Sequence, residues 1–205
     1  MPLEPMEIGI MFWATDNPVA AIRAQKDQGF RCGQLGIPGT LNLEGAAEKW
    51  KKALQDEQFT LVTVFAAYDG ESYADIPTVQ RTVGFIPPAT RADREMRTRE
   101  VIDFGAAIDL PSFACHIGFV PEDTSDEDYV GVKSMVQRVS DYCGERGMSF
   151  ALETGQEPAE ALLHFLQDCG RVNLKINFDP ANMILYGTGD KIEELEVLKD
   201  KIVCV

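Results

Sequence analysis

The chain has 205 residues, 45% of them hydrophobic and 25% charged, a balance typical of a globular domain with a substantial core. Its formal net charge of −14 argues against nucleic acids and anionic membranes as partners, because both are bound by clustered lysine and arginine. No apolar run approaches the roughly 18 residues of a spanning helix, and residues 1–13 lack the pattern of a signal peptide.

Apolar runs of strand length alternate with helical patterns along the chain. The predicted strands are 6–13, 31–36, 59–66 and 112–118, the two runs that end at Glu153 and Asp179, and 201–205. The six predicted helices are 17–29, about 44–57, one opened by Thr90 with Asp93, one capped by Thr124 with Glu127, 158–169, and one capped by Asp190 with Glu193. The long stretch 68–89 shows no regular pattern.

Strict alternation of strands and helices predicts a parallel sheet with right-handed crossovers. A doubly wound sheet and a (β/α)₈ TIM barrel both fit this pattern. We favour the barrel, because no glycine-rich loop follows the first strand, as a dinucleotide-binding sheet would require. A complete barrel takes roughly 250 residues. The prediction is therefore one domain over residues 1–205, a C-terminally incomplete TIM barrel that stops within its seventh strand.

Glu153 and Asp179 each follow a short apolar strand and precede turn residues. Because the carboxyl ends of parallel strands meet at one edge of a barrel, we expect the two carboxylates to share a site. Glu153 is the candidate catalytic residue, since a carboxylate there can bind a divalent metal or take a proton from carbon beside a carbonyl. Helix-start electrostatics for Glu153 and a simple Asp-Pro turn for Asp179 are the structural alternatives.

Four further residues are candidate substrate contacts. Asn182 lies three positions after Asp179 and could bind a substrate hydroxyl or simply complete a turn. His116 stands near the end of the fourth strand, where a substrate or metal contact and a core role both fit. Trp13 ends the first strand and could form an apolar wall of the pocket or pack in the core. Arg91 belongs to a long segment that we interpret either as a lid over the substrate or as an ordered surface flap.

Two weaker signals concern polar and sulfur-containing side chains. Gln34, on the second strand, could point inward as a polar ligand. The five cysteines are scattered and include no C-x-x-C pair, which favours free, buried thiols in the cytoplasm over a disulfide framework.

Four segments resemble the sugar phosphate isomerase/epimerase family with the xylose-isomerase-like barrel. They are Ile8-Gly9-Ile10-Met11, His116-Ile117-Gly118, Leu152-Glu153-Thr154-Gly155 and Asp179-Pro180-Ala181-Asn182-Met183. The resemblance implies a divalent metal (Mn, Mg, Co or Zn) held by a Glu after strand five, an Asp after strand six, a His after strand seven and a Glu after strand eight. Glu153 and Asp179 match the first two ligands, and the other two would lie beyond Val205.

The chemistry implied by this resemblance is proton transfer on a sugar or sugar phosphate through an enediolate, with Glu153 as one of two flanking acids. Asn182 stands where some epimerases of the family have His, so the substrate could differ from theirs. Because two ligands would lie beyond Val205, an inactive, non-catalytic barrel fragment is an alternative for this chain. An apurinic-endonuclease-like metal hydrolase is a second alternative, disfavoured by the presence of only two histidines and the acidic charge. Homo-oligomer formation stays open.

Overall fold

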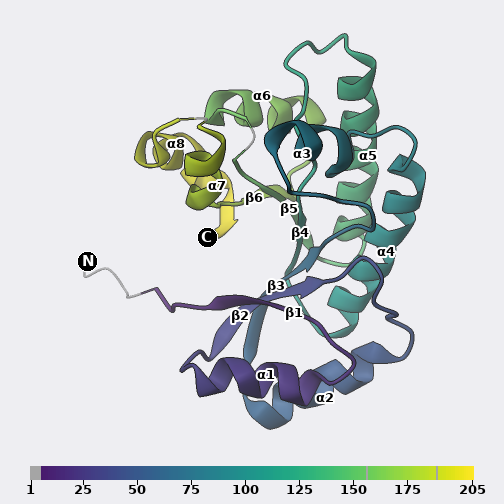
Figure 1. The fold of residues 1–205 in the computed structure, drawn as a ribbon, viewed down its shortest axis with the longest axis vertical. Coiled ribbons are helices and arrows are strands. Elements are labelled where there is room, and N and C mark those ends of the chain that lie inside the picture. The colour runs from purple at the N-terminus through teal and green to yellow at the C-terminus, as the bar shows by residue number, and fades with distance from the viewer. Residues whose placement is uncertain (1–5, 156, 188) are drawn as a thin grey trace.

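A single parallel sheet organises the computed structural model, which describes residues 6–155, 157–187 and 189–205. The strands are β1 (Ile10–Trp13), β2 (Cys32–Ile37), β3 (Thr60–Ala66), β4 (Ser112–Cys115), β5 (Ser149–Glu153), β6 (Leu174–Asn177) and β7 (Ile202–Cys204). They pair in sequence order, and every pair is parallel. The sheet curls but does not close, since β1 and β7 each have one strand neighbour among the described residues (Figure 1). The predicted incomplete (β/α)₈ barrel is confirmed.

Helices cover the outside of the curled sheet (Figure 1). The described residues form α1 (Pro18–Asp27), α2 (Ala46–Glu57), α3 (Ile76–Thr82), α4 (Arg91–Ala107), α5 (Glu127–Gly144), α6 (Ala159–Cys169), α7 (Pro180–Tyr186), α8 (Lys191–Leu198) and a 3-10 turn at Lys199–Lys201. Helices α3 and α7 were not among the six predicted ones. Each has only seven residues and begins at an aspartate close to a proline, and that pattern starts a turn as readily as a short helix.

Side-chain caps fix most of the helix starts, although two predicted caps were wrong. Asn17 and Asp190 accept hydrogen bonds from backbone N–H groups in the first turns of α1 and α8, as predicted. Thr90 precedes α4 but makes no capping bond with its side chain. Helix α5 is capped by Asp126 rather than by Thr124, because the side chain of Asp126 accepts from the N–H of Asp128. The shift of two residues is within the uncertainty of helix ends inferred from sequence.

The main hydrophobic core lies between the sheet and the helices. Phe12 points outward from β1 and packs against Trp50 of α2 and edge-on against Phe59, with ring centroids 6.4 and 5.6 Å away. Phe113 and Phe150 on β4 and β5 are fully buried in the same core, 5.3 Å apart. A much smaller cluster, Phe65, Ala114 and Ala151, lines the inner side of the sheet. No helix in the described part of the chain is long and apolar enough to cross a membrane.

The segment between β3 and α4 is packed against the barrel rather than irregular. Val83 and Phe85 are fully buried, and the N–H of Phe85 donates to the carbonyl oxygen of Ile117 at 2.8 Å. Glu71 accepts from the N–H groups of Gly84 and Tyr68 at 2.8 and 3.0 Å. These bonds hold the segment over the end of β4, so its described geometry fits the ordered-flap interpretation. The lid interpretation stays a prediction.

Candidate active site

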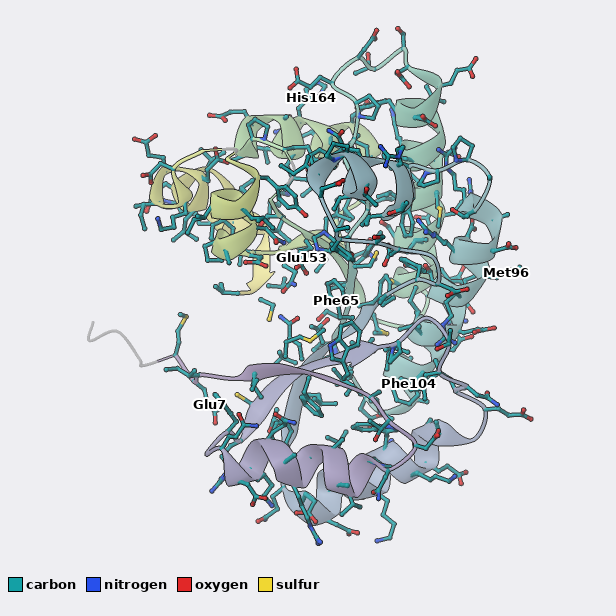
Figure 2. All side chains as sticks on the ribbon, in the orientation of Figure 1. Glu7, Phe65, Met96, Phe104, Glu153 and His164 are labelled. Atoms are coloured by element: carbon teal, nitrogen blue, oxygen red, sulfur yellow. The ribbon has the colours of Figure 1, made fainter. Side chains whose placement is uncertain are left out.

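A cavity of about 780 Å³ opens on the inner side of the sheet. Both edge strands and the carboxyl ends of the central strands contribute to it. Its lining includes Trp13, Gln34, Phe65, Tyr73, His116, Glu153, Asn177, Asp179 and Cys204. In Figure 2 Glu153 and Phe65 lie toward this concave side, whereas Phe104 lies on the side of the helices. The predicted concentration of polar groups at the carboxyl ends of the strands is therefore found around one cavity.

Glu153, the last residue of β5, is the main titratable group in this cavity. Its side chain is only 12% exposed. Its Oε2 accepts from Asn177 Nδ2 at 2.8 Å and its Oε1 from Asn182 Nδ2 at 3.4 Å. Burial raises the pKa of Glu153 to about 7, an effect opposed by the Asn177 hydrogen bond and reinforced by the charge of Asp179. The carboxyl group can therefore exist in both protonation states near neutral pH.

Asp179 follows β6 and lines the same cavity. Its Oδ1 accepts from the backbone N–H groups of Ala181 and Asn182 at 2.8 and 3.2 Å, which caps α7. The turn interpretation of Asp-Pro is thus correct for the backbone. Asn182 links the two acids, because its backbone N–H donates to Asp179 and its side-chain Nδ2 donates to Glu153, and the charge of Asp179 raises the pKa of Glu153. The structure therefore brings the two predicted carboxylates together and gives Asp179 a capping role as well.

The two acidic motifs are locked to each other by Thr154 and Gly155. The Thr154 hydroxyl accepts from the N–H of Asp179 at 2.8 Å. Gly155 has φ of +133°, and a Cβ there would lie 2.2 Å from the Cβ of Asn182. Any side chain at position 155 would push α7 away from β5. The Leu-Glu-Thr-Gly and Asp-Pro-Ala-Asn motifs are therefore two halves of one packing contact that places Asn182 beside Glu153.

His116 lies just after β4, in the loop rather than on the predicted strand. It is 8% exposed, and its Nε2 is 3.4 Å from Glu153 Oε1. Its ring meets that of Phe65 edge-on at 6.0 Å and that of Tyr73 at 5.9 Å. The residue is thus buried, as the core interpretation expected, and also faces the candidate base. Tyr73, from the segment before α3, is a cavity residue that the sequence interpretation did not single out for the site.

Asn177, the last residue of β6, was also missed. It is 5% exposed and donates to Glu153. Its Oδ1 accepts from Gln34 Nε2 at 2.8 Å, and the same Gln34 nitrogen is 2.8 Å from Cys204 Sγ. Gln34 therefore does point inward, and it contacts protein groups there. An amide residue between two apolar ones, Ile176 and Phe178, just before the strand-end aspartate was the available signal.

The two remaining predicted contacts have different outcomes. Trp13 lines the cavity and is 48% exposed, and it packs over Gly36 of β2. Arg91 is not among the cavity residues. Its guanidinium donates to the carbonyl oxygens of Phe85 and Ile86 and pairs with Asp128. These bonds hold the start of α4 to its neighbours, so the structure does not bring Arg91 together with the predicted residues that line the cavity, and its substrate contact stays a prediction.

The donor set of this cavity suits a hard divalent cation in part. Glu153 and Asp179 supply carboxylate oxygens, and no Lys or Arg is among the described residues that line the cavity. Within the described residues, no group of three or more His, Cys, Asp or Glu side chains is arranged to hold a metal ion. Two carboxylates plus water and substrate oxygens match the way Mg²⁺ is usually bound, whereas catalytic zinc sites use three protein ligands. The residues present therefore fit Mg²⁺ or Mn²⁺ better than Zn²⁺.

One protein family matches most of the chain. The family model described as xylose isomerase-like TIM barrel matches residues 22–205. No curated protein matches the chain. A xylose isomerase domain protein from Planctomyces limnophilus is 36% identical, with a TM-score of 0.90 over 98% of this chain and 71% of the other.

Two other similar structures are sugar epimerases. The D-allulose 3-epimerase from Methylomonas sp. in complex with D-allulose has 16% identity and a TM-score of 0.70, over 97% of this chain and 71% of that one. The 3-keto-D-glucoside 4-epimerase from E. coli has 15% identity and a TM-score of 0.69, over 97% and 77%. At these identities the likeness concerns the fold alone.

Proposed function

The chain belongs to the xylose isomerase-like TIM-barrel family, and on that premise we propose that it is a metal-dependent isomerase or epimerase of a sugar or sugar phosphate. A shared barrel supports many reactions, so the proposal rests on the site rather than on the fold. The observation that carries it is the position of Glu153. A buried carboxyl group with a pKa near 7 faces a cavity and lies beside Asp179, Asn177, Asn182 and His116.

Glu153 is the proposed general base and acid. A base works best when its pKa lies close to the working pH, because it is then largely available and still takes up a proton readily. The raised pKa of Glu153 meets this condition near neutrality. In the proposed step the ionised carboxylate removes a proton from a carbon beside the sugar carbonyl. The resulting carboxylic acid can then return the proton to a neighbouring position.

His116, Asn182 and Trp13 are proposed to hold the substrate. His116 Nε2 and the Asn182 side-chain amide both approach the Oε1 atom of Glu153, so they are placed to meet hydroxyl groups of a sugar next to the base. The half-exposed ring of Trp13 offers an apolar surface to the C–H face of a sugar. Phe65 and Tyr73 extend this apolar lining and help to exclude water.

Glu153 and Asp179 are proposed to hold the divalent cation, with Mg²⁺ or Mn²⁺ favoured by their oxygen donors. The chemistry that such an ion supplies is polarisation of the substrate's carbonyl and hydroxyl oxygens. Asp179 has one oxygen engaged in the cap of α7, which fixes the direction of its carboxylate.

We further propose that the protein is cytoplasmic, because all five cysteines are free thiols and four of them are buried.

Proton exchange provides the test. The 205-residue protein is incubated with Mn²⁺ in D₂O with a panel of ketoses, 3-keto sugars and their phosphates, and loss of carbon-bound hydrogen is followed by NMR. At least one substrate should exchange, and Glu153→Gln should slow exchange by about 10²–10⁴-fold. The matched control is Glu160→Gln, an exposed acid on α6, which should exchange at the original rate. Absence of exchange across the panel, or equal rates for Glu153→Gln and Glu160→Gln, would contradict the proposal.

A further inference from the structure

Three side chains from three strands form a line that ends at the candidate base. Gln34 on β2 donates through Nε2 to Asn177 Oδ1, and Asn177 on β6 donates through Nδ2 to Glu153 Oε2, both at 2.8 Å. Strand β2 is four places from β6 in the sheet order, so the Gln34–Asn177 bond crosses the inside of the barrel rather than running along the sheet. The line therefore joins two distant parts of the sheet to the carboxylate.

The hydrogen bonds in this line all donate toward Glu153, because of how the two side-chain amides are oriented. The carboxamide of an asparagine has one accepting and one donating end, and rotation by half a turn exchanges them. Asn177 would place its oxygen against the Glu153 carboxylate if it were turned the other way, which is unfavourable for an ionised acid. The donor from Gln34 occupies Asn177 Oδ1 and so holds the donating Nδ2 toward Glu153.

Burial makes this arrangement costly to break. Asn177 is 5% exposed, and its amide has little access to water that could replace either partner. The Gln34 nitrogen is also 2.8 Å from Cys204 Sγ on β7, so it lies where β2, β6 and β7 approach one another. On the opposite side of the carboxylate, Glu153 Oε1 faces Asn182 and His116. The two oxygens of Glu153 therefore have different surroundings, one fixed by Asn177 and one next to the substrate contacts.

We infer that Gln34 is a positioning residue, which acts through Asn177 to hold the plane of the Glu153 carboxylate with Oε1 turned toward the substrate. The inference deepens the proposed function and rests on it for its kinetic consequence. Gln34 does not touch Glu153, and its effect is carried by the orientation of one buried amide. Small errors in the placement of a base cost rate far more than they cost substrate affinity.

The kinetic test uses Gln34→Leu, which keeps the approximate volume and removes the donor. We expect kcat for proton exchange to fall about 10-fold with KM changed less than twofold. Asn177→Leu should lower kcat at least as much. Because the two residues act in series, the double variant should be no slower than Asn177→Leu alone. Gln80→Leu, at an exposed position on α3, is the matched control and should have unchanged kcat and KM. Multiplicative losses in the double variant, or a loss in Gln34→Leu that appears only in KM, would overturn the inference.

A second readout does not depend on turnover. With ¹⁵N-labelled asparagine, the side-chain amide signal of Asn177 is identified by its absence in Asn177→Leu. We expect this signal to shift in Glu153→Gln and its hydrogen exchange to accelerate at least 10-fold in Gln34→Leu, but not in Gln80→Leu. Unchanged exchange in Gln34→Leu would overturn the inference even in an active enzyme. If the wild-type protein turns over no sugar, the proposed function fails, and the amide signal still decides whether Gln34 orients Asn177.

Discussion

The outer face of the sheet is tightly packed with apolar side chains, whereas the inner face borders a cavity and carries polar side chains. On the outer face, Phe150 and Leu152 of β5 are fully buried against helices and belong to the large core. On the inner face of the same strand, Ala151 belongs to a cluster of three residues and Glu153 faces a cavity of about 780 Å³. Alternate residues of one strand thus serve packing and chemistry. The outer face is filled by apolar volume, whereas the inner face keeps free space and buried polar groups that lower stability.

The largest stability effect is expected on the outer face. Phe150→Ala removes a fully buried ring that contacts Phe113 and Phe85 at centroid distances of 5.3 and 6.4 Å. The closed surroundings cannot collapse into the space, so we expect a loss of about 3–5 kcal/mol in the free energy of unfolding. Urea unfolding of wild type and Phe150→Ala, followed by circular dichroism, measures this difference in the free energy of unfolding. A loss below about 1 kcal/mol would show that the outer core is less tightly packed than the structure indicates.

The same chemical change on the inner face should cost less. Phe65→Ala removes a ring that is 8% exposed and borders the cavity. The deletion enlarges an existing space that water can enter, so we expect a loss of only about 1–2 kcal/mol. Unfolding of Phe65→Ala and Phe150→Ala under identical conditions makes the comparison direct. Equal losses would mean that the inner face is packed as a second core and does not differ from the outer face.

The outer face could be predicted from sequence because it depends on local periodicity. In α5, for example, the apolar residues at helical spacing are all fully buried, namely Val132, Met135, Val136, Val139 and Cys143. The order of the strands followed from their alternation with helices. Helices α3 and α7 were missed because seven residues are too few for a periodic signal. The capping bond predicted for Thr90 was wrong, because threonine is common at positions where its side chain makes no capping bond.

The inner face could be predicted only where a residue ends a strand. Glu153 and Asp179 were identified in this way, since strand ends converge in any parallel barrel. The Gln34–Asn177 bond joins residues 143 positions apart, and no local pattern encodes such a contact. Arg91 does not line the cavity, and its position was hard to predict for the reverse reason. A basic residue in a loop beside the site suggests substrate binding, whereas here two backbone carbonyls and Asp128 occupy its guanidinium.

Glu157 is a buried acid that lies outside the Gln34–Asn177–Glu153 hydrogen bonds. It tests whether burial alone is enough to raise the pKa of a carboxyl group in this protein. Burial raises the pKa of Glu157 to about 7, against the effect of the Val120 N–H that donates to it. The folded protein therefore binds a proton more tightly than the unfolded chain, and this contribution to stability is lost as the pH rises from about 4.5 through 7. Glu157→Gln cannot titrate, so its stability relative to wild type should rise by about 2 kcal/mol between pH 5 and pH 8.

The measurement for Glu157 is urea unfolding across this pH range. Glu160→Gln, an exposed acid three residues further on, serves as the control and should run parallel to wild type. If the curve for Glu157→Gln also runs parallel to wild type, Glu157 is not protonated near neutrality. The raised pKa of Glu153 would then need the nearby charge of Asp179 in addition to burial.

The smallest stability effect is expected at Asp179, which caps α7 and also lines the cavity. Asn accepts the same backbone hydrogen bonds as Asp at a helix start, so Asp179→Asn should keep the cap of α7 and change stability by less than about 0.5 kcal/mol. The same substitution removes one of the two strand-end carboxylates that line the cavity, and Mn²⁺ affinity measured by calorimetry should fall about 10-fold or more. Asp190→Asn, which alters a cap of α8 outside the cavity, should leave Mn²⁺ affinity unchanged. Because the cap and the charge are separable in this variant, a large stability loss with intact Mn²⁺ binding would assign Asp179 to the fold and remove it from the site.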